Sequence, residues 1–284
     1  MSCLKSAIFL VSVLCCKIGV TSAVAQQTEP PDRDLPRPIE AHESVFLEEL
    51  TWLEVRDALR SGVTTVIVPT GGIEPNGPYL ALGKHNYILR ATTDRIARKL
   101  QNALVSPIVP FVPEGDIDPP TGHMRYPGTI SVGNETFMAL LVDIASSLRA
   151  HGFEHIILIG DSGPNQEGMK QVAEDLTARW TDGTTRIHYI PEYYDNPRWN
   201  AWLAERGIAE VNEGLHDDVR HSSIMMTVDP LTVRMPQRIA AGRFSINGVE
   251  LAPASETIAL GNELVDYQAD VTVAAILRAI ANSR

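Results

Sequence analysis

Residues 155–160 read His155-Ile156-Ile157-Leu158-Ile159-Gly160, an apolar run that ends in glycine. A second run, Val63-Thr64-Thr65-Val66-Ile67-Val68-Pro69, is rich in β-branched residues and leads into a glycine-rich loop. Strands that are apolar on both faces are typical of a parallel sheet that helices cover on both sides. The two runs therefore predict neighbouring strands at the centre of an α/β fold.

The rest of the chain continues this alternation. Further strands are expected over residues 103–112 and 186–190. Helical spacing of apolar residues predicts the helices, at residues 46–61, 86–100, 134–151, 166–181 and 256–281, and residues 222–228 are apolar and expected to be buried. The predicted fold is a three-layer α/β/α sandwich with a mostly parallel central sheet. Ligands in such folds bind at the carboxyl ends of the strands, where the loops at residues 70–86 and 160–165 lie.

The composition is that of an ordinary globular protein. The 284 residues are 44% hydrophobic and 21% charged, with a formal net charge of −11. These values exclude a disordered, collagen-like or multi-span membrane protein. The acidic balance lacks the basic surface of a nucleic-acid binder, so no nucleic-acid partner is expected.

The N-terminus predicts export. Lys5 precedes an apolar run over residues 7–16, and Ala23-Val24-Ala25 forms an A-x-A cleavage site. We expect a signal peptide at residues 1–25 and a Pro-rich linker or arm at residues 26–45, in a periplasmic or secreted protein without membrane contact after cleavage. An uncleaved anchor or a buried helix is the alternative, although the run is shorter than the ~20 residues that span a bilayer.

Cleavage at this site would remove every cysteine of the chain. These are Cys3, Cys15 and Cys16, so the mature protein would have no disulfide and no thiolate nucleophile. Any catalytic metal would then be held by histidine and carboxylate side chains.

The loop at residues 69–86 carries Glu74 and His85 on a glycine-bent segment. It is not a phosphate-binding loop, because Pro78 and Tyr79 stand where Lys and Ser or Thr are needed. No G-x-G-x-x-G follows any predicted strand, so nucleotide binding is unsupported. A glutamate and a histidine that converge at a strand end could bind a divalent metal, although a loop glutamate is also commonly a solvated residue.

Four segments resemble signatures of the creatininase (creatinine amidohydrolase) family. Residues 74–85, E-P-N-G-P-Y-L-A-L-G-K-H, resemble the family's E-Q-H-G-P-H-L-P-L-G-T-D, in which Glu, His and Asp are metal ligands. Residues 123–137 resemble H-x-x-F-P-G-T-I-S…E-T-F, residues 160–165 resemble N-G-H-G-G-N, and residues 216–226 resemble H-A-G-x-x-E-T-S-x-M-M. Together these matches cover most of residues 50–235, in order.

The resemblance implies a creatininase-like hydrolase domain at residues 46–284 and a homo-oligomer. The implied activity is metal-dependent hydrolysis of a non-peptide C–N bond in a cyclic amide, or of a lactone, with a small molecule as substrate. Four positions depart from the family's ligands: Asn76 and Ser162 replace His, His85 replaces Asp, and His221 replaces an acidic residue. The departures favour one divalent metal per chain, Zn or Mn, held by Glu74, His85, Asp161 and His221.

Other side chains near these motifs complete the predicted site. His216 or His123 is expected to move a proton, since imidazole titrates near the working pH. Hydrogen bonding to the backbone is the alternative for His216 and His221, and the alternative for His123 is that it braces the Pro-Gly turn that follows it. Asn76, Tyr79, Asp217 and Trp199 are expected to contact the substrate. Trp199 would do so as part of an aromatic wall, unless its helix simply packs on the core.

Two other functions remain open. Gly160-Asp161-Ser162 resembles the nucleophile block of GDS-type esterases, and Asp218-x-x-His221 resembles their D-x-x-H block. A serine hydrolase would use Ser162 with His221 and Asp218, but such esterases carry the serine close to the mature N-terminus. A chymotrypsin-like enzyme is excluded because the helix–strand pattern is wrong for a β-barrel. The second possibility is a catalytically inactive exported binding protein on the same scaffold.

Overall fold

The computed structural model describes residues 32–181, 183–211 and 215–283. The predicted signal peptide and the first part of the predicted linker lie outside these residues. Contacts divide the chain into two units, Met1–Pro36 and Arg37–Arg284, and the fold described below is that of the second. Within the described part, none of the helices combines the length and the apolar character needed to cross a bilayer.

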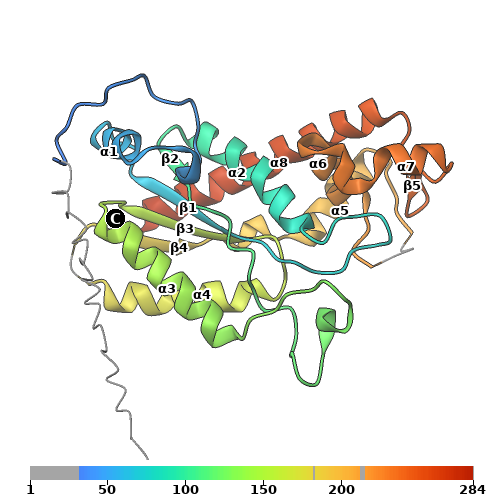
Figure 1. Cartoon of the computed structure of the whole chain (residues 1–284), viewed down its shortest axis with the longest axis horizontal. Helices are drawn as coiled ribbons and strands as arrows, with labels where there is room; N and C mark the ends of the chain where they lie inside the picture. Colours follow the sequence, from blue (N-terminus) through green and yellow to red (C-terminus); the bar gives the residue numbers. More distant parts are fainter. Residues whose placement is uncertain (1–31, 182, 212–214, 284) are drawn as a thin grey trace, which may run out of the picture. The chain divides into compact units, whose positions relative to one another are not determined.

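A parallel sheet forms the centre of the second unit, with its strands in the order β2-β1-β3-β4 (Figure 1). The strands are β1 (Thr65–Thr70), β2 (Ala103–Val105), β3 (His155–Gly160) and β4 (Arg186–Tyr189). β1 and β3 pair along their whole length, from Thr65 opposite His155 to Thr70 opposite Gly160. Every residue of β1 is buried, as expected for a strand with helices on both of its faces.

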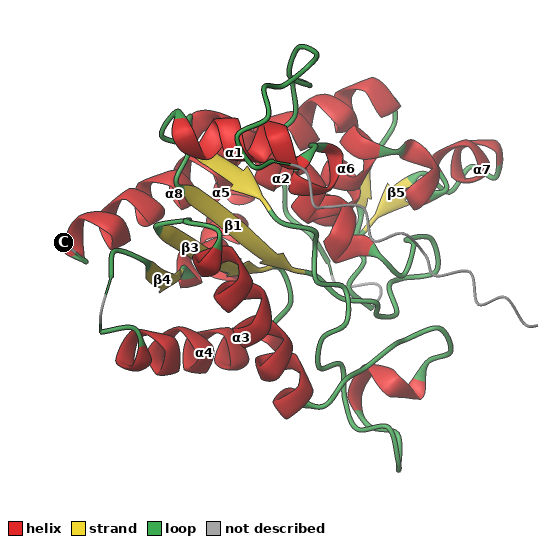
Figure 2. Ribbon diagram, turned by 60° about the vertical axis from the view of Figure 1, so that its left-hand side comes forward, coloured by secondary structure: helices red, strands yellow, loops and turns green. Residues whose placement is uncertain are grey.

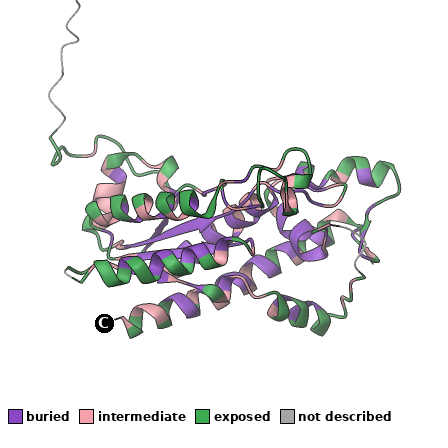
Figure 3. Ribbon diagram, turned by 90° about the horizontal axis from the view of Figure 1, so that it is seen from below, coloured by how far each residue is buried: buried purple, intermediate pink, exposed green. Residues whose placement is uncertain are grey.

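The helices form the two outer layers. One face of the sheet packs against α1 (Trp52–Arg60), α3 (Asn134–Ala150) and α4 (Asn165–Arg179), and the other against α2 (Lys84–Leu100) and α8 (Ala254–Asn282). The side chains alternate accordingly: Val66 and Val68 face the first layer, and Ile67 faces the second. Figure 3 shows that the central strands are mostly buried and that the outer sides of the helices are exposed. The predicted three-layer α/β sandwich is thus confirmed.

A second apolar cluster lies beside the sheet. It contains residues of α5 (Asn196–Glu205), α6 (Val219–Val228) and the first half of α8, together with the hairpin of β5 (Ser245–Ile246) and β6 (Val249–Glu250). The short helix α7 (Met235–Ala240) lies next to this hairpin (Figure 2). The sequence offered a helix at Trp199 only as an alternative, and it did not predict α7 or the hairpin. This cluster matters for function because it supports the segment that leads into α6.

The second strand is shorter than predicted. The expected strand covered residues 103–112, but β2 ends at Val105, and only isolated bridges at Val109 and Val112 continue it. Pro107, Pro110 and Pro113 follow β2, and proline has no N–H to donate to a sheet. The chain therefore leaves the sheet early and forms a long loop over the carboxyl edge.

Candidate functional site

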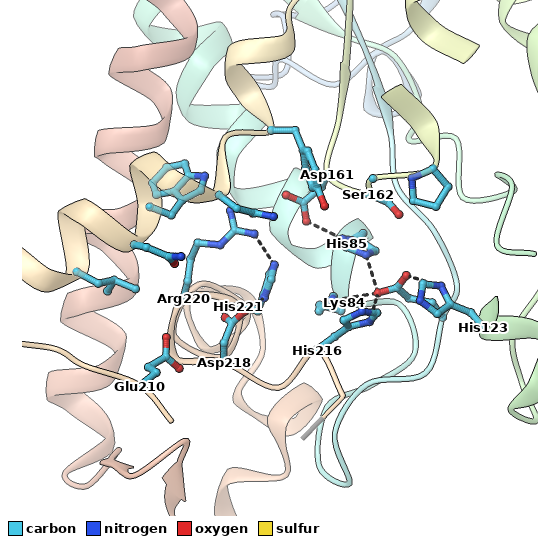
Figure 4. Close-up of a pocket in the computed structure, with 18 residues that line it drawn as sticks. Lys84, His85, His123, Asp161, Ser162, Glu210, His216, Asp218, Arg220 and His221 are labelled. Carbon is cyan, nitrogen blue, oxygen red and sulfur yellow. Dashed lines mark hydrogen bonds and ion pairs between the residues drawn. The ribbon is translucent and has the colours of Figure 1, made fainter. Parts of the chain in front are cut away.

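The carboxyl ends of the parallel strands open onto a cavity of about 570 Å³. Its lining comes from the loops after β1, β2 and β3, from α5, and from the segment that leads into α6. Figure 4 shows charged side chains from these segments turned toward one another. The position agrees with the rule that open α/β sheets bind ligands at this edge.

Glu74 lies at one end of the cavity and is only 2% exposed. Its Oε1 lies 3.0 Å from Lys84 Nζ, 2.9 Å from His85 Nε2 and 3.0 Å from His216 Nδ1. Its Oε2 lies 3.0 Å from His123 Nδ1. Burial raises the pKa of Glu74, but His216, His85 and the charge of Lys84 outweigh burial and hold the pKa well below its usual range. Glu74 is therefore ionised.

His85 connects Glu74 to Asp161. Lys84 and His85 form the first turn of α2, so both side chains start close to the Glu74 loop. His85 Nδ1 lies 2.7 Å from Asp161 Oδ2, and Asp161 follows β3 directly. Burial and Lys84 oppose protonation of His85, but the two carboxylates outweigh them and raise its pKa. Asp161, 1% exposed, keeps its negative charge because His85 outweighs the effect of burial and lowers its pKa.

Glu114 lies behind this group and was not identified from the sequence. Its Oε2 is 2.7 Å from His123 Nδ1, and its backbone N–H donates to Ser131 Oγ. Burial and the charge of Glu74 raise the pKa of Glu114 to about 8, so it holds a proton at neutral pH. One sequence signal could have identified it. Glu114 is the first charged residue after the apolar stretch that begins with β2, and it therefore follows the carboxyl end of a strand.

The opposite side of the cavity carries a second charged group. Asp218 caps the N-terminus of α6 by accepting a hydrogen bond from the backbone N–H of His221. The Nδ1 of His221 faces Asp218 Oδ2, and its Nε2 faces Arg220 Nη2. Burial and the charge of Arg220 lower the pKa of His221 to about 4, so the ring is neutral. Both ring nitrogens of His221 are therefore engaged by its neighbours.

The structure brings together a different metal-binding group from the one expected. Glu74, His123 and His216 each offer one ligand atom, and these atoms lie within 4.8 Å of one another. Of the four predicted ligands, only Glu74 belongs to this group. His85 and Asp161 lie beside it as a linked pair, and His221 lies with Asp218 and Arg220. His123 and His216, predicted as proton carriers, lie where they could act as ligands together with Glu74.

Of the four residues predicted to contact the substrate, only one lines the cavity. Trp199 lines the cavity, whereas Asn76, Tyr79 and Asp217 are not among its lining residues. Asn76 Nδ2 instead donates to the carbonyl oxygens of Glu74 and Ala81 and so holds the loop closed. The ring of Tyr79 lies under the guanidinium of Arg238. The carboxyl group of Asp217 packs against Gly77.

Ser162 lines the cavity and is 3% exposed. Among the described residues, no hydrogen bond joins its hydroxyl to a histidine, and His221 already uses both ring nitrogens. The arrangement thus lacks the serine–base contact of a serine hydrolase.

The residues near Glu74 suit one divalent cation. A carboxylate with two imidazoles is a common donor set for Zn²⁺ and related ions. Asp161 Oδ1 is a buried carboxylate oxygen without a hydrogen-bond partner in the described part of the chain, and the negative charge of Asp161 favours a cation nearby. Lys84 opposes metal binding, because its ammonium already neutralises part of the negative charge of Glu74. The predicted count of one metal per chain stays a prediction.

The fold and the site together define a class of protein: a three-layer α/β sandwich with a carboxylate–imidazole cluster at the carboxyl edge of its sheet. The chain belongs to the creatininase family, since the family model described as creatinine amidohydrolase matches residues 48–276. This family is hydrolytic, and the resemblance identified from the four motifs is confirmed.

Curated relatives within the family differ in what they act on. The chain is 27% identical to a creatinine amidohydrolase of Pseudomonas putida over 137 residues, which are 47% of this chain and 52% of that protein. It is 25% identical to a mycofactocin precursor peptide peptidase of Mycolicibacterium smegmatis, over 72% of this chain and 81% of that protein. A 3-dehydro-scyllo-inosose hydrolase of Thermotoga maritima is 25% identical over 55% of this chain and 45% of that protein.

Solved creatininases have the same fold. A crystal structure of creatinine amidohydrolase matches with a TM-score of 0.55 at 21% identity, over 85% of this chain and 98% of that one. A manganese form of creatininase matches with a TM-score of 0.56 at 22% identity, over 85% of this chain and 99% of that one. At this level of identity the comparison establishes the fold alone.

Proposed function

We propose that this protein is a metal-dependent hydrolase that opens a non-peptide C–N bond of a cyclic amide, or a lactone, in a small molecule. One observation carries the proposal: Glu74, His123 and His216 converge in a cavity at the carboxyl edge of the sheet. The cavity volume, about 570 Å³, suits a small molecule. Relatives described as an amidohydrolase, a peptidase and an inosose hydrolase support hydrolysis as the reaction class.

Glu74, His123 and His216 would hold one divalent ion. Creatininase structures of Mn and Zn-Zn types support either metal, and a bound ion would polarise the scissile carbonyl and lower the pKa of a bound water. The chain's own residues prepare this group. His85, which Asp161 holds in place, contacts Glu74 and helps to keep it ionised, and the proton of Glu114 prevents a second negative charge beside it. Trp199 supplies an apolar wall for the substrate.

A binding protein without turnover is the second candidate, and one observation favours it. Lys84 Nζ lies 3.0 Å from Glu74 Oε1, with each side chain 2% exposed, so a cation is already built into the site. The family pattern has Thr at the position of Lys84 and Asp at that of His85. Both differences add positive charge where a metal would bind, which disfavours a further cation.

Metal analysis of the purified chain separates these candidates. We expect close to one Zn or Mn per chain after purification without chelator, and chelation followed by metal return should abolish and restore hydrolysis of cyclic amides or lactones. A metal content below about 0.2 ions per chain, with hydrolytic activity intact, would refute the metal mechanism. The absence of turnover on a broad amide and lactone panel, together with little or no retained metal, would favour the binding protein.

Two variants locate the metal. His216→Ala should lower metal content to near zero, whereas His221→Ala should leave it close to that of the unaltered chain, because His221 is engaged by Asp218 and Arg220. The control is His151→Ala, at an exposed position. The reverse pattern would instead support the ligand set expected from the sequence.

Export and self-association complete the proposal. Residues 1–25 support a periplasmic or secreted location, and the family resemblance supports a homo-oligomer. The acidic net charge of −11 supports a small molecule, and not a nucleic acid, as the partner. Fractionation of cells that express the full chain tests the first point, and light scattering of the purified protein tests the second.

A further inference from the structure

Arg220 is a buried guanidinium that lines the cavity on the side away from His123 (Figure 4). It is the second residue of α6 and is only 5% exposed. Its guanidinium carbon lies 5.2 Å from the centre of the Trp199 ring, a distance typical of a cation–π contact. The side chain is therefore held in place by the first turn of α6 and by the indole of α5.

The guanidinium lacks a carboxylate partner among the described residues. Its Nη2 donates to the neutral Nε2 of His221, which leaves most of its five N–H groups without a protein acceptor. The carboxylates around the cavity are each held by other groups: Asp161 by His85, Asp218 by His221, Glu210 by Asn247, and Glu74 by Lys84. The positive charge of Arg220 favours the ionised forms of Asp161, Asp218 and Glu210, but among the described residues none of them forms an ion pair with it, so its remaining N–H groups need an acceptor from the cavity.

Other hydrogen-bond donors lie near Arg220. The indole Nε1 of Trp199 is a buried donor without a hydrogen-bond partner in the described part of the chain. The amide side chains Asn196 and Asn200 line the same cavity and can donate further hydrogen bonds. Several side chains that carry hydrogen-bond donors thus line the cavity together with Arg220.

We propose that Arg220 binds a carboxylate of the substrate, so that the substrate class is a small cyclic amide or lactone that carries a carboxylate. A planar guanidinium accepts a carboxylate through two parallel hydrogen bonds, and the Trp199 ring fixes the plane of the pair. The nearby carboxylates of Asp161, Asp218 and Glu210 favour a singly charged group over a phosphate dianion. The inference rests on the proposed hydrolase, because the bond to be broken would lie near Glu74 while Arg220 anchors the far end.

Calorimetric binding of matched ligands tests this. L-pyroglutamate and its amide, and hydantoin-5-acetate and its amide, differ only in the charged group. We expect each carboxylate to bind the purified chain at least about tenfold more tightly than its amide. Arg220→Gln should abolish this preference, and Arg220→Lys should keep part of it. Arg179→Gln, at an exposed position on α4, is the matched control and should change nothing.

Several outcomes would overturn the inference. The first is that the unaltered chain shows no preference for the carboxylate in either ligand pair. The second is that Arg220→Gln keeps the preference unchanged and has a melting temperature close to normal. The third is that inorganic phosphate is the only ligand whose binding depends on Arg220. If Arg220→Gln does not fold, the Arg220→Lys result decides. The readout is independent of turnover: a carboxylate preference without metal or hydrolysis would refute only the proposed function, and metal-dependent hydrolysis without the preference would refute only this inference.

Discussion

Lys84 and Glu74 form an ion pair that is closed to solvent, with Nζ 3.0 Å from Oε1 and each side chain 2% exposed. The pair lies inside the same group of side chains that offers ligands to a metal. An ammonium there repels an incoming cation, because charges interact strongly where water is excluded. We therefore expect Lys84 to weaken the binding of a metal at this site.

Removal of the ammonium should strengthen metal binding. We expect Lys84→Gln to bind Zn²⁺ at least about tenfold more tightly than the unaltered chain, as measured by competition with a chelating dye. Lys170→Gln, at an exposed position, serves as the control. Equal or weaker binding by Lys84→Gln, with a normal melting temperature, would show that Lys84 supports the site and does not compete with the metal.

Replacement of Ser162 should leave hydrolysis almost intact. The hydroxyl makes no hydrogen bond to a histidine in the described part of the chain, so it has no base to activate it. We expect Ser162→Ala to keep kcat/KM within about threefold of normal on whichever amide or lactone is turned over. A loss of more than about 100-fold with the fold intact would establish the serine mechanism instead.

The packing of α6 against α8 depends on Gly261. A Cβ added at Gly261 would lie 2.1 Å from the backbone oxygen of Ser223 and 2.8 Å from a Thr227 methyl. Gly261→Ala should therefore lower the free energy of unfolding by about 1–3 kcal/mol, although alanine is the better helix former. Urea unfolding measures this. Gly133→Ala, where nothing lies within 4 Å of the added Cβ, lacks this clash and should cost less, about 1 kcal/mol or below, because it removes only a glycine N-cap from α3. A stabilised Gly261→Ala would contradict the packing described for these helices.

Lower pH should destabilise the fold through His188. Burial, with the charges of His155 and Arg186, lowers the pKa of His188 from 6.5 to about 4. Below pH 6.5 the unfolded chain binds a proton that the folded chain excludes until about pH 4. Above pH 6.5 His188 therefore does not change the free energy of unfolding. As the pH falls from 6.5 to about 4, the free energy of unfolding decreases by up to about 3 kcal/mol.

Urea unfolding of the chain and of His188→Gln between pH 7.5 and pH 4.5 checks this. We expect a shallower decline in the variant, with exposed His151→Gln as the control. Identical slopes in the unaltered chain and His188→Gln would mean that His188 takes up its proton normally in the folded state.

The main strands and the helices that cover the sheet were predictable because each carries its own local signal. β3 is an uninterrupted apolar run, and α1 begins with a capping box in which Thr51 and Glu54 exchange hydrogen bonds. Short elements beyond the sheet lacked such signals. α5 and the β5–β6 hairpin are stabilised mainly by the cluster that they share with α6 and α8, so tertiary packing outweighs their local preferences.

The site was predictable only in part. The sequence placed Glu74, Asp161 and His216 at the carboxyl edge, since that follows from strand direction and from the motifs. Lys84 and Arg220 are ordinary basic residues in the sequence. Their importance depends on burial, which leaves Lys84 paired with Glu74 and Arg220 without a carboxylate.

The sequence by itself determined the α/β fold, the family and the loops that carry carboxylates and imidazoles. Only the tertiary structure decided which imidazoles meet. Ring nitrogens act over about 3 Å, and whether they face a common point depends on the side-chain orientations and loop closures that bring distant segments together. His123 and His216 come from such separate loops and converge on Glu74, whereas His221 turns to Asp218 in its own helix cap.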